Sequence, residues 1–199
     1  MSSYTIEVIL EPSEKDLIKG CLNGLASSQR LLYKRYAGKM FVVCRRYANS
    51  REEAEDILQE GFITVFKKLS QFKMEGSFEG WIRRIMVSRA IEHYRKMIRM
   101  FPVIDIEGIE EKFVSPENVL SNIATKDLLE MIQELPLINK LVFNLFIFED
   151  KSHKEIAQSL NIAEGTSKSA LFHARIILRK KIKMSMMVAQ NNSYNEKRL

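Results

Sequence analysis

The stretch from Asp56 to Arg99 constrains the fold most, because it reads as two long helices joined by a short turn. Its first part, DILQEGFITVFKKL, repeats apolar residues at the spacing of one helical face, and its last part, FEGWIRRIMVSRAIEHYRKMIR, is a helix rich in Arg. Long strand-like alternations are absent, and 8 Gly and 4 Pro are few for 199 residues, so the sequence favours an all-α fold. A helix that could bind protein beside one that could bind nucleic acid suggests an adaptor rather than an enzyme.

The first of these helices is predicted at about residues 51–69, where Ser50 and Glu53 form a capping-box signature. At 100° per residue, one face is apolar and predicts the core side; it comprises Ala54, Leu58, Gly61, Phe62, Val65 and Leu69. The opposite side gathers Asp56, Gln59, Glu60, Ile63 and Lys67, with Ile57 and Phe66 at its margins. The pattern fits an ordinary solvated face, but an exposed Ile among hydrogen-bonding groups also suits a protein interface.

The second helix is predicted at about residues 78–99, after a turn at 70–77 that contains Lys73 and Gly76. One arc of roughly 80° on this helix is polar and basic; it carries Arg84, Ser88, Glu92, Arg95 and Arg99. Such side chains can reach phosphates and base edges, although a solvated charged face would look the same.

Charge is distributed in blocks along a chain whose net charge is +6 and whose pI is about 9.3. Residues 73–99 carry seven Lys and Arg against three acids, and residues 151–185 carry eight against two. Between them, residues 101–123 carry one Lys against five acids. Two basic blocks separated by an acidic one predict contact with a polyanion at two places.

Two further helices are predicted before this stretch, at about 14–23, capped by Ser13, and at about 27–47. The second has one apolar face made by Leu32, Tyr36, Met40, Val43 and Tyr47. After residue 99 the helical pattern fails, and the acidic segment is interrupted by Pro102, Gly108 and Pro116. We read it as a linker, so the fold class is all-α, with two small helical domains joined by an acidic linker.

The second domain begins with helices at about 124–135 and from Pro136, the latter apolar nearly all round and therefore buried. Ser152 and Glu155 then form a second capping-box signature, followed by a short helix, a turn at 161–162 and a longer basic helix from about residue 164. This order predicts a helix-turn-helix, with an ordinary helical hairpin as the alternative. The buried side of the long helix would be Ala170, Leu171, Ala174, Ile177 and Leu178. Its first turn offers Glu164, Thr166, Ser167, Lys168 and Ser169, while the polar tail from Met184 is expected to fray.

Other function classes find little support in the sequence. His93, His153 and His173 lie far apart, and no catalytic triad spacing or phosphate-binding glycine loop is present, so we expect no enzyme, no small-molecule substrate and no cofactor. Cys21 and Cys44 lack metal-ligand spacing and fit a reducing compartment, so no metal site is expected. Neither a signal peptide nor an apolar run long enough to enter a membrane is recognisable, which predicts a cytoplasmic protein.

Three motifs in this order resemble the extracytoplasmic-function (ECF) sigma factors of the bacterial sigma-70 family. AEDILQEGFITVF is similar to the core-polymerase-binding segment, GSFEGWIRRI with YRK to the −10 element helix, and SHKEIAQSLNIAEGTSKSALFHAR to the −35 element helix-turn-helix. The resemblance covers about 14–98 and 124–183. It implies sigma region 2 at 14–98, a linker at 99–123 and sigma region 4 at 124–183.

The resemblance also implies roles for the faces identified above. Polymerase would be bound by Asp56, Gln59, Glu60, Ile63 and Phe66. The −10 element would be bound by Lys73, Arg83, Arg84, Ser88, Glu92, Arg95 and Lys96, with the turn at 71–77 capturing an unstacked base. The −35 element would be bound by Thr166, Ser167, Lys168, Ser169, His173 and Arg175. Partners would be core RNA polymerase and promoter DNA, and for many relatives an anti-sigma factor; the acidic linker would pass through polymerase channels.

Four positions depart from the family pattern. The family often has Asn at position 88, Asp at 92, Ser at 163 and Arg at 170, where this chain has Ser88, Glu92, Ala163 and Ala170. These departures leave promoter choice open but not the general role. We expect a sigma factor that directs transcription initiation by −10 and −35 recognition and promoter melting. A lone DNA-binding regulator, an enzyme or a purely structural protein are the alternatives, and the first leaves the ordered polar face at 56–63 unexplained.

Overall fold

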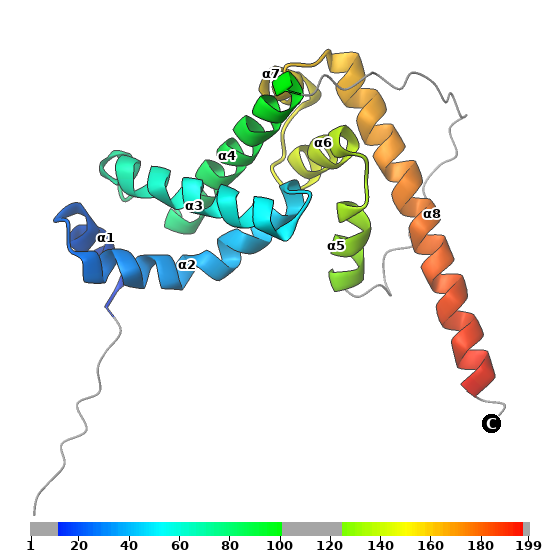
Figure 1. Ribbon diagram of the computed structural model, residues 1–199, viewed down its shortest axis with the longest axis horizontal. Coiled ribbons are helices and arrows are strands. Elements are labelled where there is room, and N and C mark those ends of the chain that lie inside the picture. The colour runs from blue at the N-terminus through cyan, green and yellow to red at the C-terminus, as the bar shows by residue number, and fades with distance from the viewer. Residues whose placement is uncertain (1–11, 101–124, 197–199) are drawn as a thin grey trace, which may run out of the picture.

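The computed structural model describes residues 12–100 and 125–196, and within them it contains helices and no strands. The first group of helices is α1 (Glu14–Leu22), α2 (Ala26–Tyr47), α3 (Arg51–Lys68), the short 3-10 helix η1 (Leu69–Gln71) and α4 (Phe78–Met100). The second group is α5 (Thr125–Gln133), α6 (Leu137–Ile147), α7 (His153–Leu160) and α8 (Glu164–Glu196). Figure 1 shows α1–α4 gathered at one end of the molecule and α8 as a long rod at the other. The all-α prediction is confirmed.

Side-chain caps begin three of the helices where the sequence predicts them. The Ser13 hydroxyl accepts a hydrogen bond from the Asp16 amide at 3.2 Å, and the Ser50 hydroxyl accepts one from the Glu53 amide at 3.1 Å. At α7, Ser152 and Glu155 form a complete capping box. Hydrogen bonds from Ser152 lower the pKa of the Glu155 carboxyl. These contacts satisfy amides that have no partner within the helix, which fixes where each helix starts.

The core of the first group lies between α2, α3 and α4. The predicted core faces are buried: on α2 they are Leu32, Tyr36, Met40, Val43 and Tyr47, and on α3 they are Ala54, Leu58, Gly61, Phe62 and Val65. Helices α3 and α4 pack tightly at Gly61, where an added Cβ atom would lie only 2.1 Å from the Met86 Sδ atom. Glycine at this position therefore lets the helix that carries the predicted protein-binding face pack directly on the Arg-rich helix.

An aromatic cluster closes the end of this core beneath the turn at 71–77. Phe78, 1% exposed, packs edge-on against Tyr36 at a centroid distance of 5.6 Å and parallel to Trp81 at 5.7 Å. Phe72 reaches back from the turn to both Phe78 and Trp81, at 4.9 and 5.5 Å. The turn is thus tied to the core by one aromatic side chain at its start and by helix α4 at its end.

The second group is built around α6, which packs on α7 and α8. Leu141, Val142 and Leu145 of α6 are buried, as predicted, and Ile156 and Leu160 of α7 join them. The prediction of a nearly all-apolar α6 missed three buried polar side chains, Asn139, Lys140 and Asn144. Asn144 and Lys140 bond to the first group, which explains why polar groups are tolerated there.

Helix α8 differs from the prediction at its end. We expected a frayed polar tail from Met184, but α8 continues to Glu196. The run from residue 184 to 196 contains neither Gly nor Pro, and its Met, Ala and Gln are good helix formers, so nothing in it stops the helix. The predicted linker at 99–123 lies outside the described residues except for positions 99 and 100, which belong to the last turn of α4.

Both cysteines lie inside the first group and no described pair forms a disulfide. Burial raises the pKa of the Cys21 thiol, and it raises that of Cys44 to about 12. At neutral pH both thiols are therefore protonated and behave as small apolar groups.

Within the described residues, no helix is both long and apolar enough to cross a membrane.

Candidate functional site

The outer face of α3 is the first candidate surface. It consists of Asp56, Gln59, Glu60 and Ile63, which are all exposed. Ile63 is 54% exposed although it belongs to a helix whose other face is fully packed. Phe66, at the margin, is half-buried, and its ring lies tilted against that of Phe62 at a centroid distance of 6.2 Å. An apolar side chain held in solvent among carboxylate and amide groups is the arrangement expected of a protein-docking face.

A shallow basic groove adjoins this face between α3 and α4. It has a volume of about 360 Å3 and is lined by Glu60, Ile63, Thr64, Lys67, Lys68, Arg89 and Lys96. Arg89 is partly neutralised by an ion pair with Glu92 at 2.8 Å. Of the residues predicted to touch DNA, only Lys96 lines this groove. One cation of the −10 set therefore lies close to the outer face of α3.

The turn at 71–77 contains two residues in the left-handed backbone conformation. Met74 and Gly76 have positive φ angles of 60° and 72°, and the Ser77 hydroxyl accepts a hydrogen bond from the Gly80 amide at 3.1 Å, which caps α4. Phe72 points inward, whereas Lys73 and Met74 are exposed. A turn with an inward aromatic anchor and outward side chains can form one wall of a pocket for an extruded base.

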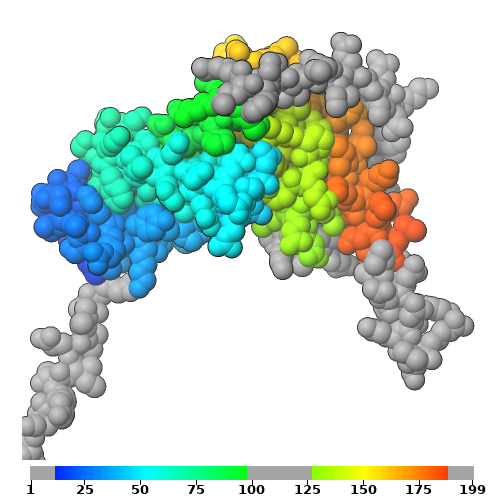
Figure 2. Space-filling view, in the orientation of Figure 1, coloured from blue at the N-terminus to red at the C-terminus, as the bar shows by residue number. Residues whose placement is uncertain are grey.

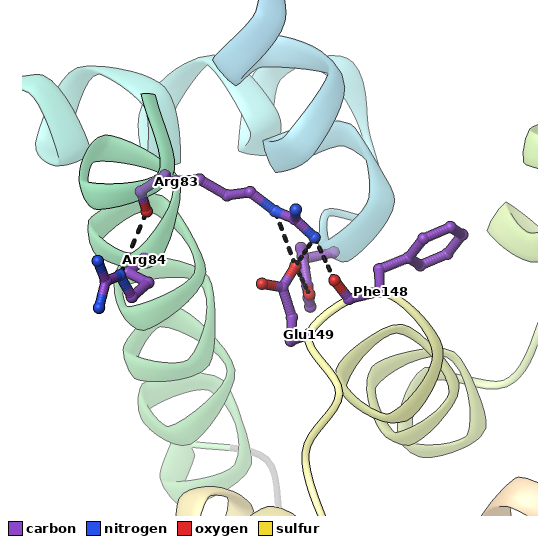
Figure 3. Close-up of polar contacts among 6 residues, drawn as sticks. Arg83, Arg84, Phe148 and Glu149 are labelled. Carbon is purple, nitrogen blue, oxygen red and sulfur yellow. Dashed lines mark hydrogen bonds and ion pairs between the residues drawn. The ribbon is translucent and has the colours of Figure 1, made fainter. Parts of the chain in front are cut away.

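Some of the residues of α4 that are predicted to contact the −10 element face solvent, and others bond within the protein. Arg84 and Ser88 are exposed, and among the described residues the Arg84 side chain bonds only to the Gly80 carbonyl of its own helix. Arg83, by contrast, points to the second group and forms an ion pair with Glu149 at 2.8 Å (Figure 3). Arg95 donates to the Gln158 carbonyl at 3.0 Å. Two of the predicted DNA-contacting arginines are therefore engaged within the protein.

The helix-turn-helix is formed by α7 and the start of α8. Asn161, with φ 57°, ends α7 in a left-handed conformation, which turns the chain into α8. Lys168 and Ser169 project from the first turns of α8; Lys168 pairs with Glu164 at 2.8 Å, and the Ser169 hydroxyl donates to the Thr166 carbonyl at 3.1 Å. The Lys168 ammonium lowers the pKa of the Glu164 carboxyl. These exposed groups at a helix start can enter a major groove.

The structure corrects the prediction for Ser167. Its side chain is fully buried and lies 3.0 Å from the His153 Nδ1 atom, so it links α7 to α8 instead of facing solvent. The sequence carried the signal, because residues 167, 170, 171 and 174 share one face at helical spacing. We therefore assign Ser167 to positioning the two helices and not to DNA contact.

The remaining predicted residues of α8 lie beyond its first turns. Arg175 is exposed, and its guanidinium lies 5.7 Å from the centre of the Phe146 ring. His173 is half-buried, edge-on to Phe172 at 5.7 Å. Sequence reasoning missed Lys140 and Glu149, whose partners are far away in the chain and leave no local pattern.

Comparison with known proteins identifies the family to which this chain is similar. The model of sigma-70 region 2 matches residues 32–99, and the model of sigma-70 region 4 matches residues 125–178. The RNA polymerase sigma-H factor of Pseudomonas aeruginosa is 26% identical, covering 84% of this chain and 93% of its own length. The ECF RNA polymerase sigma-E factor of Haemophilus influenzae is 29% identical, covering 87% of this chain and 97% of its own.

Among solved structures, a sigma factor of Bartonella quintana, crystallised with an anti-sigma factor, matches with a TM-score of 0.46 and 19% identity, covering 77% of this chain and 96% of that one. The two region models fall on the two helical groups in the order that the motifs predict. The chain belongs to the sigma-70 family and is an RNA polymerase sigma factor of the ECF type.

Proposed function

We propose that this sigma factor binds core RNA polymerase through the outer face of α3, defined by Asp56, Gln59, Glu60 and Ile63. The observation that carries the proposal is the exposure of Ile63 at the centre of that polar face. Phe66, at its half-buried margin, would add apolar contact on approach of a partner. In the domain division that we propose, residues 14–98 act as region 2 and residues 124–183 as region 4, with 99–123 as the linker.

For DNA, we assign the turn at 71–77 and the arc of α4 to the −10 element. Lys73, Arg84, Ser88 and Glu92 are accessible for this role, while Lys96 would approach phosphates. The −35 element would be read by Lys168 and Ser169, with Thr166, His173 and Arg175 against the DNA backbone.

The polymerase performs the chemistry; this chain supplies recognition, holds the opened strand and has no catalytic activity of its own. Because its partners are polymerase and the chromosome, it would act in the cytoplasm. An anti-sigma factor is the further partner that family membership suggests.

The affinity for core polymerase, measured together with run-off transcription, tests the polymerase-binding face. Asp56→Ala with Gln59→Ala is expected to weaken polymerase binding at least about tenfold, since central interface residues contribute on the order of 1–2 kcal/mol each. Glu55→Ala is the control: it removes one carboxylate from the same helix, about a quarter turn from Asp56 and one turn before Gln59 at the edge of the face, and its surface ion pair with Arg51 contributes little. Unchanged affinity of the double variant, or no promoter-specific transcript from the wild-type chain, would refute the proposal.

The DNA assignments require a promoter, which the 5′ ends of transcripts made during overproduction would supply. On that promoter, Lys168→Ala is expected to weaken holoenzyme binding about 5- to 100-fold through the −35 element, given that a good base contact is worth about 1–3 kcal/mol. Lys180→Ala, an exposed cation three turns further along α8, should change it far less. Arg84→Ala should reduce permanganate reactivity of the opened −10 region. Equal effects of Lys168→Ala and Lys180→Ala would point to non-specific charge alone.

A further inference from the structure

A buried polar contact joins the two helices of the helix-turn-helix. The His153 Nδ1 atom lies 3.0 Å from the Ser167 Oγ atom, within hydrogen-bond distance. Ser167 is completely buried, and His153 is the first residue of α7, immediately after the Ser152 cap. The capping box of Ser152 and Glu155 fixes the start of α7, so the imidazole reaches α8 from a well-defined helix end.

The Ser167 side chain lies among the residues that we assign to the −35 element. Thr166, Lys168 and Ser169 flank it on the first turns of α8, and Lys168 and Ser169 are exposed. These residues belong to one helix, so they turn together when α8 rotates about its axis. A rotation of about 20° moves the outer end of a side chain by about 2 Å, given the usual diameter of a helix. Hydrogen bonds to base edges do not tolerate such a shift.

Ser167 is a polar member of the α8 face that packs inward. Its apolar neighbours on that face, Ala170, Leu171 and Ala174, are buried, but apolar packing has no preferred direction. A hydrogen bond does have one, and leaving a buried hydroxyl without its partner costs free energy. The contact with His153 therefore selects one rotation of α8 among those that apolar packing would allow.

The ring of the same imidazole contacts α6. It stacks on Phe146 with a centroid distance of 5.0 Å and an interplanar angle of 27°. The Arg175 guanidinium, further along α8, lies 5.7 Å from the centre of the same Phe146 ring, within the range of a cation–π contact. Figure 2 shows the yellow-green atoms of α6 directly against the orange atoms of α8. His153 thus supports the aromatic ring on which Arg175, a proposed contact to the DNA backbone, is held.

We propose that His153 is a positioning residue for −35 recognition, and that two parts of its side chain act on different DNA contacts. The Nδ1 atom sets the rotation of α8 through Ser167 and so orients Lys168 and Ser169 toward the bases. The ring holds Phe146 in place and so orients Arg175 toward a phosphate. This role rests on the proposed −35 function of α8. It assigns base discrimination and general DNA affinity to separate atoms of one side chain.

Three replacements of His153 separate the two parts. His153→Asn places an amide atom where Nδ1 stands, since both lie two bonds from Cβ, but it lacks the ring. His153→Phe keeps an aromatic ring against Phe146 but cannot form a hydrogen bond with Ser167. His153→Gln is the matched control for Asn, because it carries the same amide one bond further from the backbone.

Holoenzyme binding is measured on the promoter mapped from transcript 5′ ends and on the same fragment with its −35 element replaced. The ratio of the two affinities reports base discrimination, and it does not depend on the fraction of folded protein, because both values come from one preparation. His153→Phe is expected to lower this ratio about three- to tenfold, the effect of one hydrogen bond. Ser167→Ala should lower it by the same factor, and the two changes combined should lower it no further.

His153→Asn should show the opposite behaviour: the ratio stays close to that of the wild type, while binding to both fragments weakens about two- to fivefold as Arg175 loses its support. His153→Gln should lose both. An unchanged ratio in His153→Phe, or equal ratios in the Asn and Gln variants, would overturn the role of Nδ1. Unchanged affinity for both fragments in His153→Asn would overturn the role of the ring. A wild-type ratio of one would instead refute the proposed −35 function of α8.

Discussion

Replacing Phe78 by Ala is expected to lower the free energy of unfolding by about 3–5 kcal/mol, the range found when a buried Phe is truncated. Phe78 is almost completely buried and stands at the centre of the cluster with Tyr36, Phe72 and Trp81. Losing its ring leaves a cavity at the start of α4 and removes the surface on which Phe72 rests. We therefore also expect weaker −10 recognition, since the turn at 71–77 loses its anchor.

Urea unfolding followed by circular dichroism measures the effect, and Phe78→Leu serves as a graded control. Leu restores most of the apolar volume, so its loss should be less than half that of Ala. A loss below about 1 kcal/mol for Phe78→Ala would mean that the surrounding rings collapse to fill the cavity. In that case the turn at 71–77 would be held mainly by Ser77 and the start of α4.

Replacing Gly61 by Ala is expected to destabilise the protein by about 1–3 kcal/mol, although Ala is the better helix former. The added Cβ would lie 2.1 Å from the Met86 sulfur atom. Because Met86 is fully buried, its side chain cannot move aside into solvent. Gly38→Ala gives the opposite sign: Gly38 is exposed on α2, its added Cβ would meet no described atom within 4 Å apart from the local backbone of α2, and stability should rise by about 0.5–1 kcal/mol.

The Gly61 effect has a second, sharper test. If the clash with Met86 is the cause, Gly61→Ala combined with Met86→Ala should be less destabilising than the sum of the two single variants. Additive losses, measured by the same urea unfolding, would mean that the two helices move apart instead. That outcome would displace the α3 docking face relative to the α4 arc, and polymerase-dependent transcription would fall in the single variant as well.

Local signals in the sequence were enough to predict the helices. Ser50 with Glu53 and Ser152 with Glu155 are caps because their partners lie three residues away, and this spacing is visible in the chain. The exposure of Ile63 followed from its angle on α3. For Ser167, position in the first turn of a recognition helix predicts a DNA contact, whereas its angular position on α8 predicts the burial that the structure shows.

Contacts between the two groups could not be predicted in this way. Lys140 and Ala48 are 92 residues apart, and Arg83 and Glu149 are 66 apart, so no periodicity links them. A Lys within an apolar helix is expected to extend its ammonium group to water. In the structure, the Lys140 ammonium group instead donates to the Ala48 carbonyl, which has no partner within α2. This pairing exists only when the two groups of helices are packed together.

The aromatic cluster under the turn has a spectroscopic consequence. Trp81 is the only tryptophan of the chain, and it lies in contact with Phe72 and Phe78 immediately below residues 71–77. Its fluorescence therefore comes from one place, the floor of the proposed pocket for an extruded base. Any rearrangement of that floor when a DNA strand enters is reported by the tryptophan emission of an unlabelled protein, in real time and with no second tryptophan to compete.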